Sequence, residues 1–228
     1  FNRAFWDDSL ETYVLALDGK KNPCRVKASN AGHCLFCGIA TPVRARKAAK
    51  QIMNEKLFNG WGVRTLAADE VHYNPMSYHN GSVWPHDTAI TAYGLARYGM
   101  MEEAMLLMKG LFNASLFIDL QRMPELFCGF TFRKGEAPTA YPVACSPQAW
   151  SVAAVFLMLQ ACLQITVDAY QKKIYFNKPT LPDFLYEVRI TNLKFGDDVF
   201  EIEFFRYEYD LGIHLLKKPA DWDVITWK

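Results

Sequence analysis

The sequence lacks any concentration of charge of one sign. It has 25 lysine and arginine residues against 24 aspartate and glutamate residues, a formal net charge of +1, and no long basic run. Proteins that bind nucleic acid depend on clustered basic side chains that neutralise phosphates. The even charge balance therefore argues against a nucleic-acid partner and favours a neutral one.

Long apolar runs are also missing. The longest run, residues 152–159, is far shorter than the roughly 20 residues that cross a bilayer. The chain starts at Phe1 without an initiator methionine and without the basic, apolar and small-residue order of a signal peptide. We expect a soluble cytoplasmic protein that does not bind membranes, and we expect this chain to be a piece of a longer one.

The cysteines do not form a complete metal-binding pattern. Cys34 and Cys37 in "HCLFC" look like half of a zinc site, but zinc takes about four ligands and no second close pair follows. We predict that both belong to the core and that the protein needs no cofactor or metal. The apolar surroundings of Cys128, Cys145 and Cys162 predict reduced, packed thiols, as in a cytosolic protein.

Helical periodicity covers much of the first two thirds of the chain. Residues 41–58 carry an apolar stripe with Pro42 in the first turn, which predicts a helix. Asp87 is placed to cap a second helix that stops at Gly99, and a third follows over residues 101–119.

One more helix is predicted after a long loop. Ser146 suits its N-cap and Pro147 its first turn. Its sequence is apolar nearly all round, so we expect neighbours to bury it on several sides. Helices joined alternately by tight turns and long loops predict hairpins around a centre, with the long loops at one end.

The pattern changes to alternation after Val167. Residues 173–176, 185–191 and 199–206 read as strands, and Phe200, Ile202 and Phe204 should face inward. We predict a helical domain over residues 1–168 and a small antiparallel β subdomain over residues 169–228.

Two loop segments, "GWGVRTL" and "YHNGSVWPHD", combine aromatic rings with side chains that hydrogen-bond. This mixture suits a carbohydrate, whose ring faces are apolar and whose hydroxyls both donate and accept. The candidate residues are Trp61, Arg64, Tyr78, His79, Asn80, Trp84 and His86. A purely structural reading is equally open, with Trp84 as a core plug and the histidines bonded to loop carbonyls.

Two carboxylates invite different interpretations. Asp87 at a helix N-terminus would be stabilised in its charged form, which suits a cap or a hydrogen-bond acceptor better than a proton donor. Glu125 follows Pro124 in a loop and has apolar neighbours. It is either paired with Arg122 or Arg133, or kept in a cleft for proton transfer.

Several motifs together resemble one family. "SNAGHCLFCGIA", "GWGVRTL", "YNPMSYHNGSVWPHD", "RMPELFCGF" and "YPVACSPQAW" are similar, in this order, to the C-terminal half of bacterial amylo-alpha-1,6-glucosidases, or glycogen-debranching-enzyme-like proteins. The resemblance implies a mainly α fold: part of an (α/α)6 toroid of helical hairpins, with the active site at the loop end, followed by a small antiparallel β tail. Residues 1–168 would be the C-terminal part of the catalytic domain.

The resemblance also implies an activity. In this clan, which includes the inverting mannosylglycerate hydrolases, a Glu before the final inner helix is the general base, and Glu125 matches that position. The expected substrate is an α-glucoside, such as the α-1,6 branches of a glycogen-like glucan. It would contact the candidate residues above together with Asp87 and Trp150.

One part of the family's pattern is absent. The general acid lies in a Gly-Arg-Asp-type segment upstream, and "GRD" does not occur in this sequence. Only about half of the toroid's helices can be found, so we expect the N-terminal half of the toroid to come from another polypeptide segment. The alternative is a noncatalytic carbohydrate-binding or regulatory remnant of such an enzyme.

Overall fold

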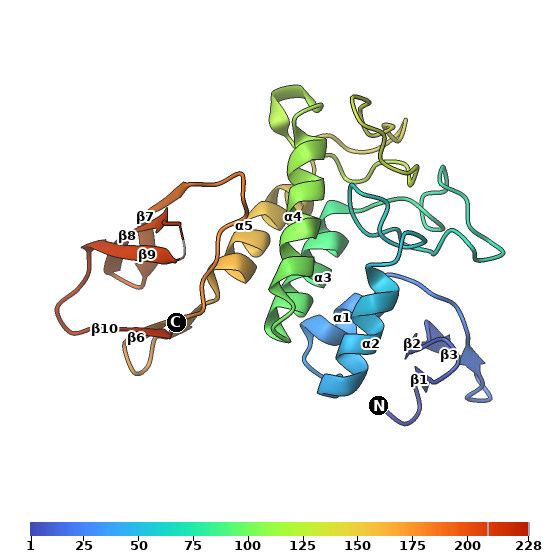
Figure 1. Ribbon diagram of the computed structural model, residues 1–228, viewed down its shortest axis with the longest axis horizontal. Coiled ribbons are helices and arrows are strands. Elements are labelled where there is room, and N and C mark those ends of the chain that lie inside the picture. The colour runs from blue at the N-terminus through green and yellow to red at the C-terminus, as the bar shows by residue number, and fades with distance from the viewer. Residues whose placement is uncertain (209, 228) are drawn as a thin grey trace. The chain divides into compact units, whose positions relative to one another are not determined.

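The computed structural model describes residues 1–208 and 210–227 and divides the chain into two compact units. Unit 1 comprises residues 1–158, and unit 2 begins at Leu159. Figure 1 shows helices and long loops in unit 1 and mainly strands in unit 2. No helix in the described ranges has the length and apolar character needed to cross a membrane.

The prediction of a mainly α toroid is wrong. Helices account for 28% of the residues and strands for 24%, and the described ranges hold five α-helices and four small sheets. Long segments between the helices, residues 53–84 and 116–148, are almost entirely turns and irregular backbone. Because turn-forming Gly, Pro, Asn and Ser are frequent in these segments, they do not extend the helices.

Unit 1 begins with two small hairpins. Strand β1 (Trp6–Asp7) pairs with β2 (Thr12–Tyr13), and β3 (Ala16–Leu17) pairs with β4 (Pro23–Cys24), both antiparallel. These strands are not predicted from the sequence, because two-residue strands show no alternation.

The helices follow. They are α1 (Asn30–Phe36), α2 (Pro42–Ile52), α3 (Pro85–Arg97), α4 (Met101–Ser115) and α5 (Ala149–Leu163), with one turn of 3-10 helix, η1 (Asp119–Gln121), after α4.

Four predicted helix ends need correction. α4 stops at Ser115 instead of residue 119. α2 stops at Ile52, and α3 starts two residues before Asp87, because Pro85 already has the backbone conformation that a first turn requires. Trp84 is therefore the N-cap residue, and Asp87 lies inside the first turn without a side-chain capping bond. α5 begins at Ala149 instead of Pro147, since the N–H of Gln148 is bonded to Met123 O in the preceding loop.

The burial of α5 also differs from the prediction. Ser151, Ala154 and Met158 form one buried stripe, whereas Val152 and Phe156 are exposed. Although the sequence of α5 is apolar nearly all round, the described chain does not bury the helix on several sides.

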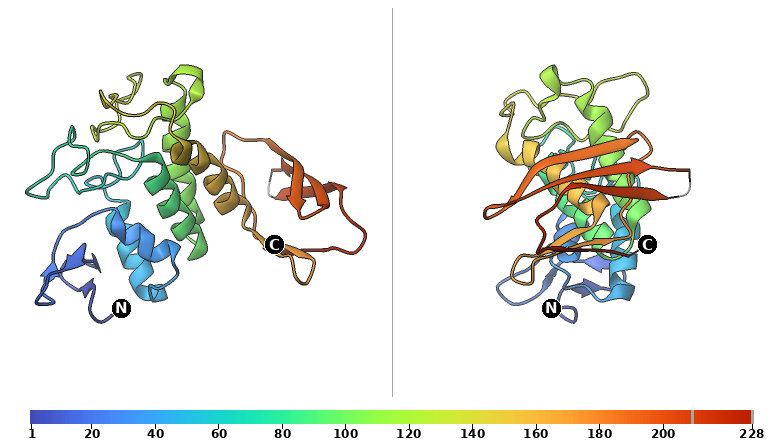
Figure 2. Two further views of the ribbon diagram at one scale, coloured as in Figure 1. Left: turned by 180° about the vertical axis from the view of Figure 1, so that it is seen from behind. Right: turned by 90° about the vertical axis from the view of Figure 1, so that its left-hand side faces the viewer.

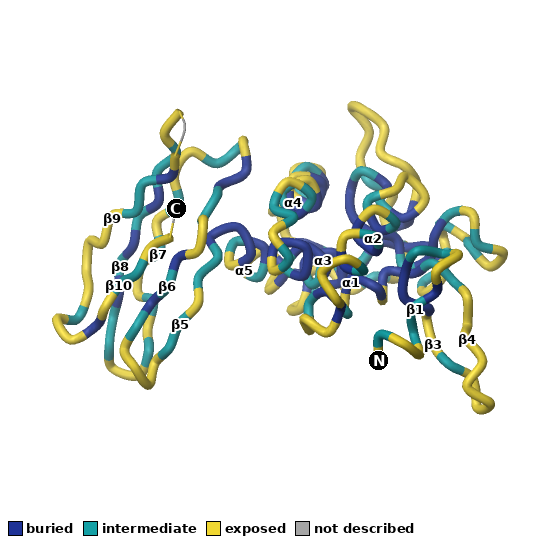
Figure 3. The backbone as a smooth tube through the Cα atoms, turned by 60° about the horizontal axis from the view of Figure 1, so that its bottom comes forward, coloured by how far each residue is buried: buried dark blue, intermediate teal, exposed yellow. Residues whose placement is uncertain are grey.

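Close packing of α1 against α3 depends on two glycines. A Cβ on Gly94 would lie 2.6 Å from the backbone nitrogen of Phe36, and one on Gly32 would overlap the side chain of Thr91. Figure 3 shows α3 largely in the colour of buried residues, and α1 is buried at Ala31, Gly32 and Leu35. Because there is no side chain at these points, the N-terminal ends of α1 and α3 can lie beside the same cleft.

Backbone pairing joins the two long loops. Val83 forms one-residue antiparallel bridges with Arg64 and with Phe127, and Phe127 forms another with Ala140. Figures 1 and 2 show the loops lying together from both sides. The pairing therefore brings residues just before α3 next to the segment that contains Glu125.

Unit 2 contains two three-stranded sheets. One has the order β10 (Asp223–Trp227), β6 (Lys173–Asn177), β5 (Ile165–Asp168), and the other β7 (Glu187–Phe195), β8 (Asp198–Arg206), β9 (Leu211–Lys217). Phe200, Ile202 and Phe204 are fully buried in the core of this unit, so their predicted inward orientation is confirmed. The subdomain is not purely antiparallel, because β10 runs parallel to β6.

We predict that Gly94→Ala lowers the free energy of unfolding by about 1–3 kcal/mol, because overpacking would separate α1 from α3. Urea unfolding followed by circular dichroism measures this. Gly19→Ala is the matched control, since a Cβ there meets nothing within 4 Å. A Gly94→Ala variant as stable as the parent would show that the close approach is not needed.

Candidate functional site

A cleft of about 360 Å³ opens beside the N-terminal end of α3, within unit 1. Its lining combines α1 and the residues before it, the loop that precedes α3, and the first turns of α3 and α5. The lining residues are Leu15, Ala28, Ser29, Asn30, His33, Thr65, Leu66, His79, Asn80, Trp84, His86, Asp87 and Trp150. Six of the ten predicted site residues are in this set: His79, Asn80, Trp84, His86, Asp87 and Trp150.

Aromatic rings form one wall of the cleft. The ring centroids of His86 and Trp150 are 5.2 Å apart, and those of Trp84 and Trp150 are 6.4 Å apart. The Trp84 indole N–H donates to Ser82 Oγ at 3.0 Å, which fixes the ring. Trp150 is 47% exposed. This wall offers an apolar surface of the kind that covers a sugar ring face.

His86 lines the cleft and has one buried ring nitrogen without a partner among the described residues. Its Nδ1 is buried without a hydrogen-bond partner in the described chain, and burial lowers the pKa of the imidazole. The ring is therefore neutral near pH 7. Because orphaned buried N–H groups are rarer than orphaned acceptors, we expect Nε2 to carry the proton. His86 would then donate to a ligand oxygen.

A second histidine in the cleft, His33, was not predicted as a site residue. Its Nε2 lies 2.5 Å from Asp87 Oδ1. This hydrogen bond raises the pKa of His33, and its effect is larger than that of burial, which lowers the pKa. The pair links α1 to α3. The two residues are 54 positions apart, so only the fold reveals the contact.

Glu125 lies just behind the cleft, with 7% of its surface exposed. Its Oε1 accepts a hydrogen bond of 2.6 Å from the Tyr78 hydroxyl, and this bond raises the pKa of Tyr78 to about 12. Its Oε2 accepts a longer bond, 3.4 Å, from the Cys145 N–H. Among the described residues Glu125 forms no ion pair, and Arg133 instead pairs with Glu136.

Tyr78 connects Glu125 to the cleft wall. Its ring packs edge to face against Trp84, with centroids 4.8 Å apart. The Glu125 carboxylate is also one of the charges that act on His86. Glu125 is thus one side chain away from the cleft lining, on the side of Trp84.

Trp61 and Arg64 lie elsewhere. Trp61 is 2% exposed and packs against Phe132. The Arg64 guanidinium, also buried, donates to the carbonyl groups of Glu55, Lys56 and Gly129 and to the Thr131 hydroxyl. These bonds hold the two long loops together, so we leave both residues out of the proposed ligand-contacting set.

The predicted positions of three cysteines need correction. Cys37 and Cys145 are exposed and Cys34 is half-buried, because each lies at a helix or loop surface, whereas Cys128 and Cys162 are buried as predicted. Over residues 1–208 and 210–227, no group of three His, Cys, Asp or Glu side chains is arranged to hold a metal ion.

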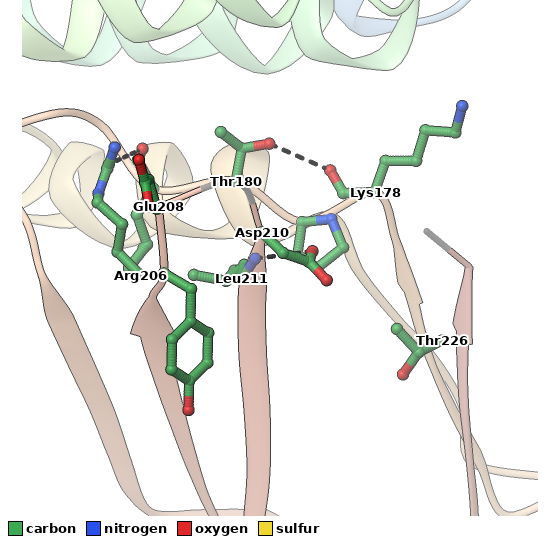
Figure 4. A pocket seen from close by; sticks show the side chains of 10 residues that line it. Lys178, Thr180, Arg206, Glu208, Asp210, Leu211 and Thr226 are labelled. Atoms are coloured by element: carbon green, nitrogen blue, oxygen red, sulfur yellow. Dashed lines mark hydrogen bonds between the residues drawn. The ribbon is translucent and has the colours of Figure 1, made fainter.

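Unit 2 has a hollow of its own, of about 370 Å³ (Figure 4). Arg206 is one of the lining residues, and its guanidinium donates to the carbonyl oxygens of Leu181, Pro182 and Leu185. Lys178 extends away from the other lining residues in Figure 4. The arginine guanidinium therefore holds the backbone beside the hollow through bonds within the protein.

The cleft, with its aromatic wall and adjacent carboxylate, fits a protein that acts on sugars, and the comparison with protein families agrees. Residues 1–118, more than half of the chain, match the mannosylglycerate hydrolase MGH1-like glycoside hydrolase domain. The chain therefore belongs to this family of glycoside hydrolases. The match is not specific to the amylo-alpha-1,6-glucosidases, and Glu125 lies beyond the matched residues. No curated protein sequence matches significantly.

Solved structures show the same fold. The GH63 mannosylglycerate hydrolase from Thermus thermophilus in complex with glucose is 21% identical over 68% of this chain and 36% of its own, with a TM-score of 0.53. Neutral trehalase from Saccharomyces cerevisiae is 17% identical over 70% and 28%, with a TM-score of 0.54. The GH78 rhamnosidase of Bacillus sp. GL1 is 13% identical over 99% and 21%, with a TM-score of 0.65. The chain thus spans about a third of the length of the mannosylglycerate hydrolase.

We predict that NMR titration finds His33 with a pKa above its ordinary value and His86 with one below. Because folding raises the pKa of His33, its bond to Asp87 stabilises the fold fully below the unfolded pKa of about 6.5. That stabilisation is lost as the pH rises through the folded value. Asp87→Asn should return the His33 pKa toward normal; an unchanged His33 titration would contradict the pairing.

Proposed function

We propose that the protein containing this chain is an inverting glycoside hydrolase that cleaves α-glucosidic linkages, with Glu125 as the general base. The observation that carries the proposal is the position of Glu125: a nearly buried carboxylate without an ion pair among the described residues, held by Tyr78 beside an aromatic cleft.

The surroundings of Glu125 suit proton transfer from water. Inversion needs one carboxylate to activate a water and another, roughly 6.5–9.5 Å away, to protonate the leaving oxygen. The Tyr78 hydroxyl occupies one lone pair of Oε1, and the 3.4 Å contact from Cys145 holds Oε2 only weakly. Oε2 is therefore the oxygen that we assign to the water. We assign the general acid to a part of the protein outside this sequence, because Asp87, the carboxylate among the described residues that line the cleft, is already bonded to His33.

The cleft supplies contacts for one glucosyl unit. The Trp84 and Trp150 rings would cover an apolar face of the sugar, and His86 would donate to a hydroxyl. His79 and Asn80, both at the rim, can donate and accept hydrogen bonds with further hydroxyls. We propose an α-1,6 branch in a glycogen-like glucan as the substrate, in keeping with the motifs shared with debranching-type enzymes.

Replacing the proposed base tests the role of Glu125. Glu125→Gln in the protein that contains this chain should reduce glucose release from branched maltooligosaccharides by roughly 1,000-fold. Calorimetry should show that binding of the same sugars is retained, because the amide keeps the size of the side chain. Glu136→Gln, in the same loop but exposed and paired with Arg133, is the matched control. Full turnover by the Glu125→Gln variant would remove Glu125 from the base role.

Removing only the Tyr78 hydroxyl tests whether this residue positions the base. Tyr78→Phe keeps the ring against Trp84 but frees Oε1, so we expect kcat to fall roughly 10- to 100-fold with little change in KM. Tyr141→Phe is the control, because its ring also packs near Tyr78, at 5.6 Å, without a bond to Glu125. A rise in KM at constant kcat would instead indicate that the hydroxyl contacts substrate.

A further inference from the structure

An aromatic platform lies on unit 2, on strands that take no part in the cleft. The rings of Tyr175 on β6 and Trp227 on β10 are parallel, with an interplanar angle of 5° and centroids 5.4 Å apart. Trp227 is 51% exposed. Trp227 is therefore not held in place by packing into the core of unit 2.

Strand register explains why both rings lie on the outer face of the sheet. Ile174 and Phe176 alternate with Tyr175 and are fully buried in the core, so Tyr175 must point to the opposite side. In the parallel pairing, Ile225 lies opposite Tyr175 and Trp227 opposite Asn177. Both rings consequently project from the face that the core does not use.

The same face carries polar groups around the rings. By register these are Thr166 and Asp168 on β5, Lys173 and Asn177 on β6, and Asp223 on β10. Among the residues that the structure describes, neither the Asn177 side-chain amide nor the Tyr175 hydroxyl has a hydrogen-bond partner in the protein, whereas Asp168 Oδ1 accepts a hydrogen bond from the Gln171 N–H. The platform thus combines an exposed ring surface with hydroxyl, amide and carboxylate groups that are available to a ligand.

This chemistry is specific enough to indicate a class of ligand. A nucleic acid would need clustered cations, and the face has one lysine against two aspartates. An apolar peptide would not use the polar groups that surround the rings. A neutral oligosaccharide uses both, because its ring faces stack on aromatics while its hydroxyls bond to amides and carboxylates.

We propose that the outer face of the β5–β6–β10 sheet is a second, noncatalytic carbohydrate-binding surface, with Trp227 and Tyr175 as its platform and Asn177 as a hydrogen-bonding group. Such a surface would hold one part of a long glucan on the protein while another part of the same glucan is bound in the cleft. The platform is separate in sequence and in structural unit from the cleft residues, so it can bind even if the proposed activity is wrong.

Affinity electrophoresis in gels containing glycogen tests the proposal on the full chain. Measurements in a Trp84→Ala background remove the contribution of the cleft. In this background, Trp227→Ala should weaken retardation by glycogen roughly tenfold, and Tyr175→Ala should weaken it too. Tyr170→Ala is the matched control, because Tyr170 is 98% exposed in the same unit but has no stacking partner in the described chain.

Thermal unfolding of each variant separates binding from a purely structural cross-strand pair. The proposal expects Trp227→Ala to lose glycogen binding while the melting temperature stays close to that of the Tyr170→Ala control. If the Trp227→Ala variant still binds glycogen, the proposal is overturned, whether or not the melting temperature of the variant falls. Glycogen binding that survives in the Trp84→Ala background but not after Trp227→Ala supports the platform independently of any catalytic result.

Discussion

The paired backbone of Val83 and Phe127 is the constraint on which the site depends. Each N–H donates to the carbonyl of the other, at 2.9 and 3.0 Å, and Val83 also bridges to Arg64. One irregular loop is thereby fixed against another. Glu125, two residues before Phe127, is brought beside Tyr78, and the next residues after Val83 enter α3 and supply the cleft wall.

Electrostatics and packing then give the neighbouring carboxylates different surroundings. Asp87 is bonded to a histidine whose pKa it raises, and it links two helices that glycines allow to approach closely. Glu125 is bonded to a neutral tyrosine hydroxyl. A carboxylate with a neutral partner keeps its own charge uncompensated, which suits a group that must take a proton from water.

The sequence allowed much of this to be predicted where the signal was local. The alternation of Phe200, Ile202 and Phe204 identified an inward strand face, and the segment containing His79, Trp84 and His86 indicated a cleft-lining loop. Contacts between segments that are distant in the sequence could not be predicted from it. Nothing near His33 signals its bond to Asp87, and nothing in "GWGVRTL" shows that Arg64 is bonded to carbonyls of other loops. The helical fraction was overestimated because the mainly α fold was taken from the family resemblance, and because α2 and α4 end earlier than their apolar patterns predict.

A crystal structure of the protein containing this chain with a bound maltooligosaccharide tests the central claim most directly. We expect a glucosyl ring stacked on Trp84 and Trp150, with a water between its anomeric carbon and the Glu125 carboxylate and with Tyr78 still bonded to Oε1. A sugar bound in the cleft with Glu125 turned away from it, or no sugar in the cleft at all, would show that Glu125 is not the base of this site.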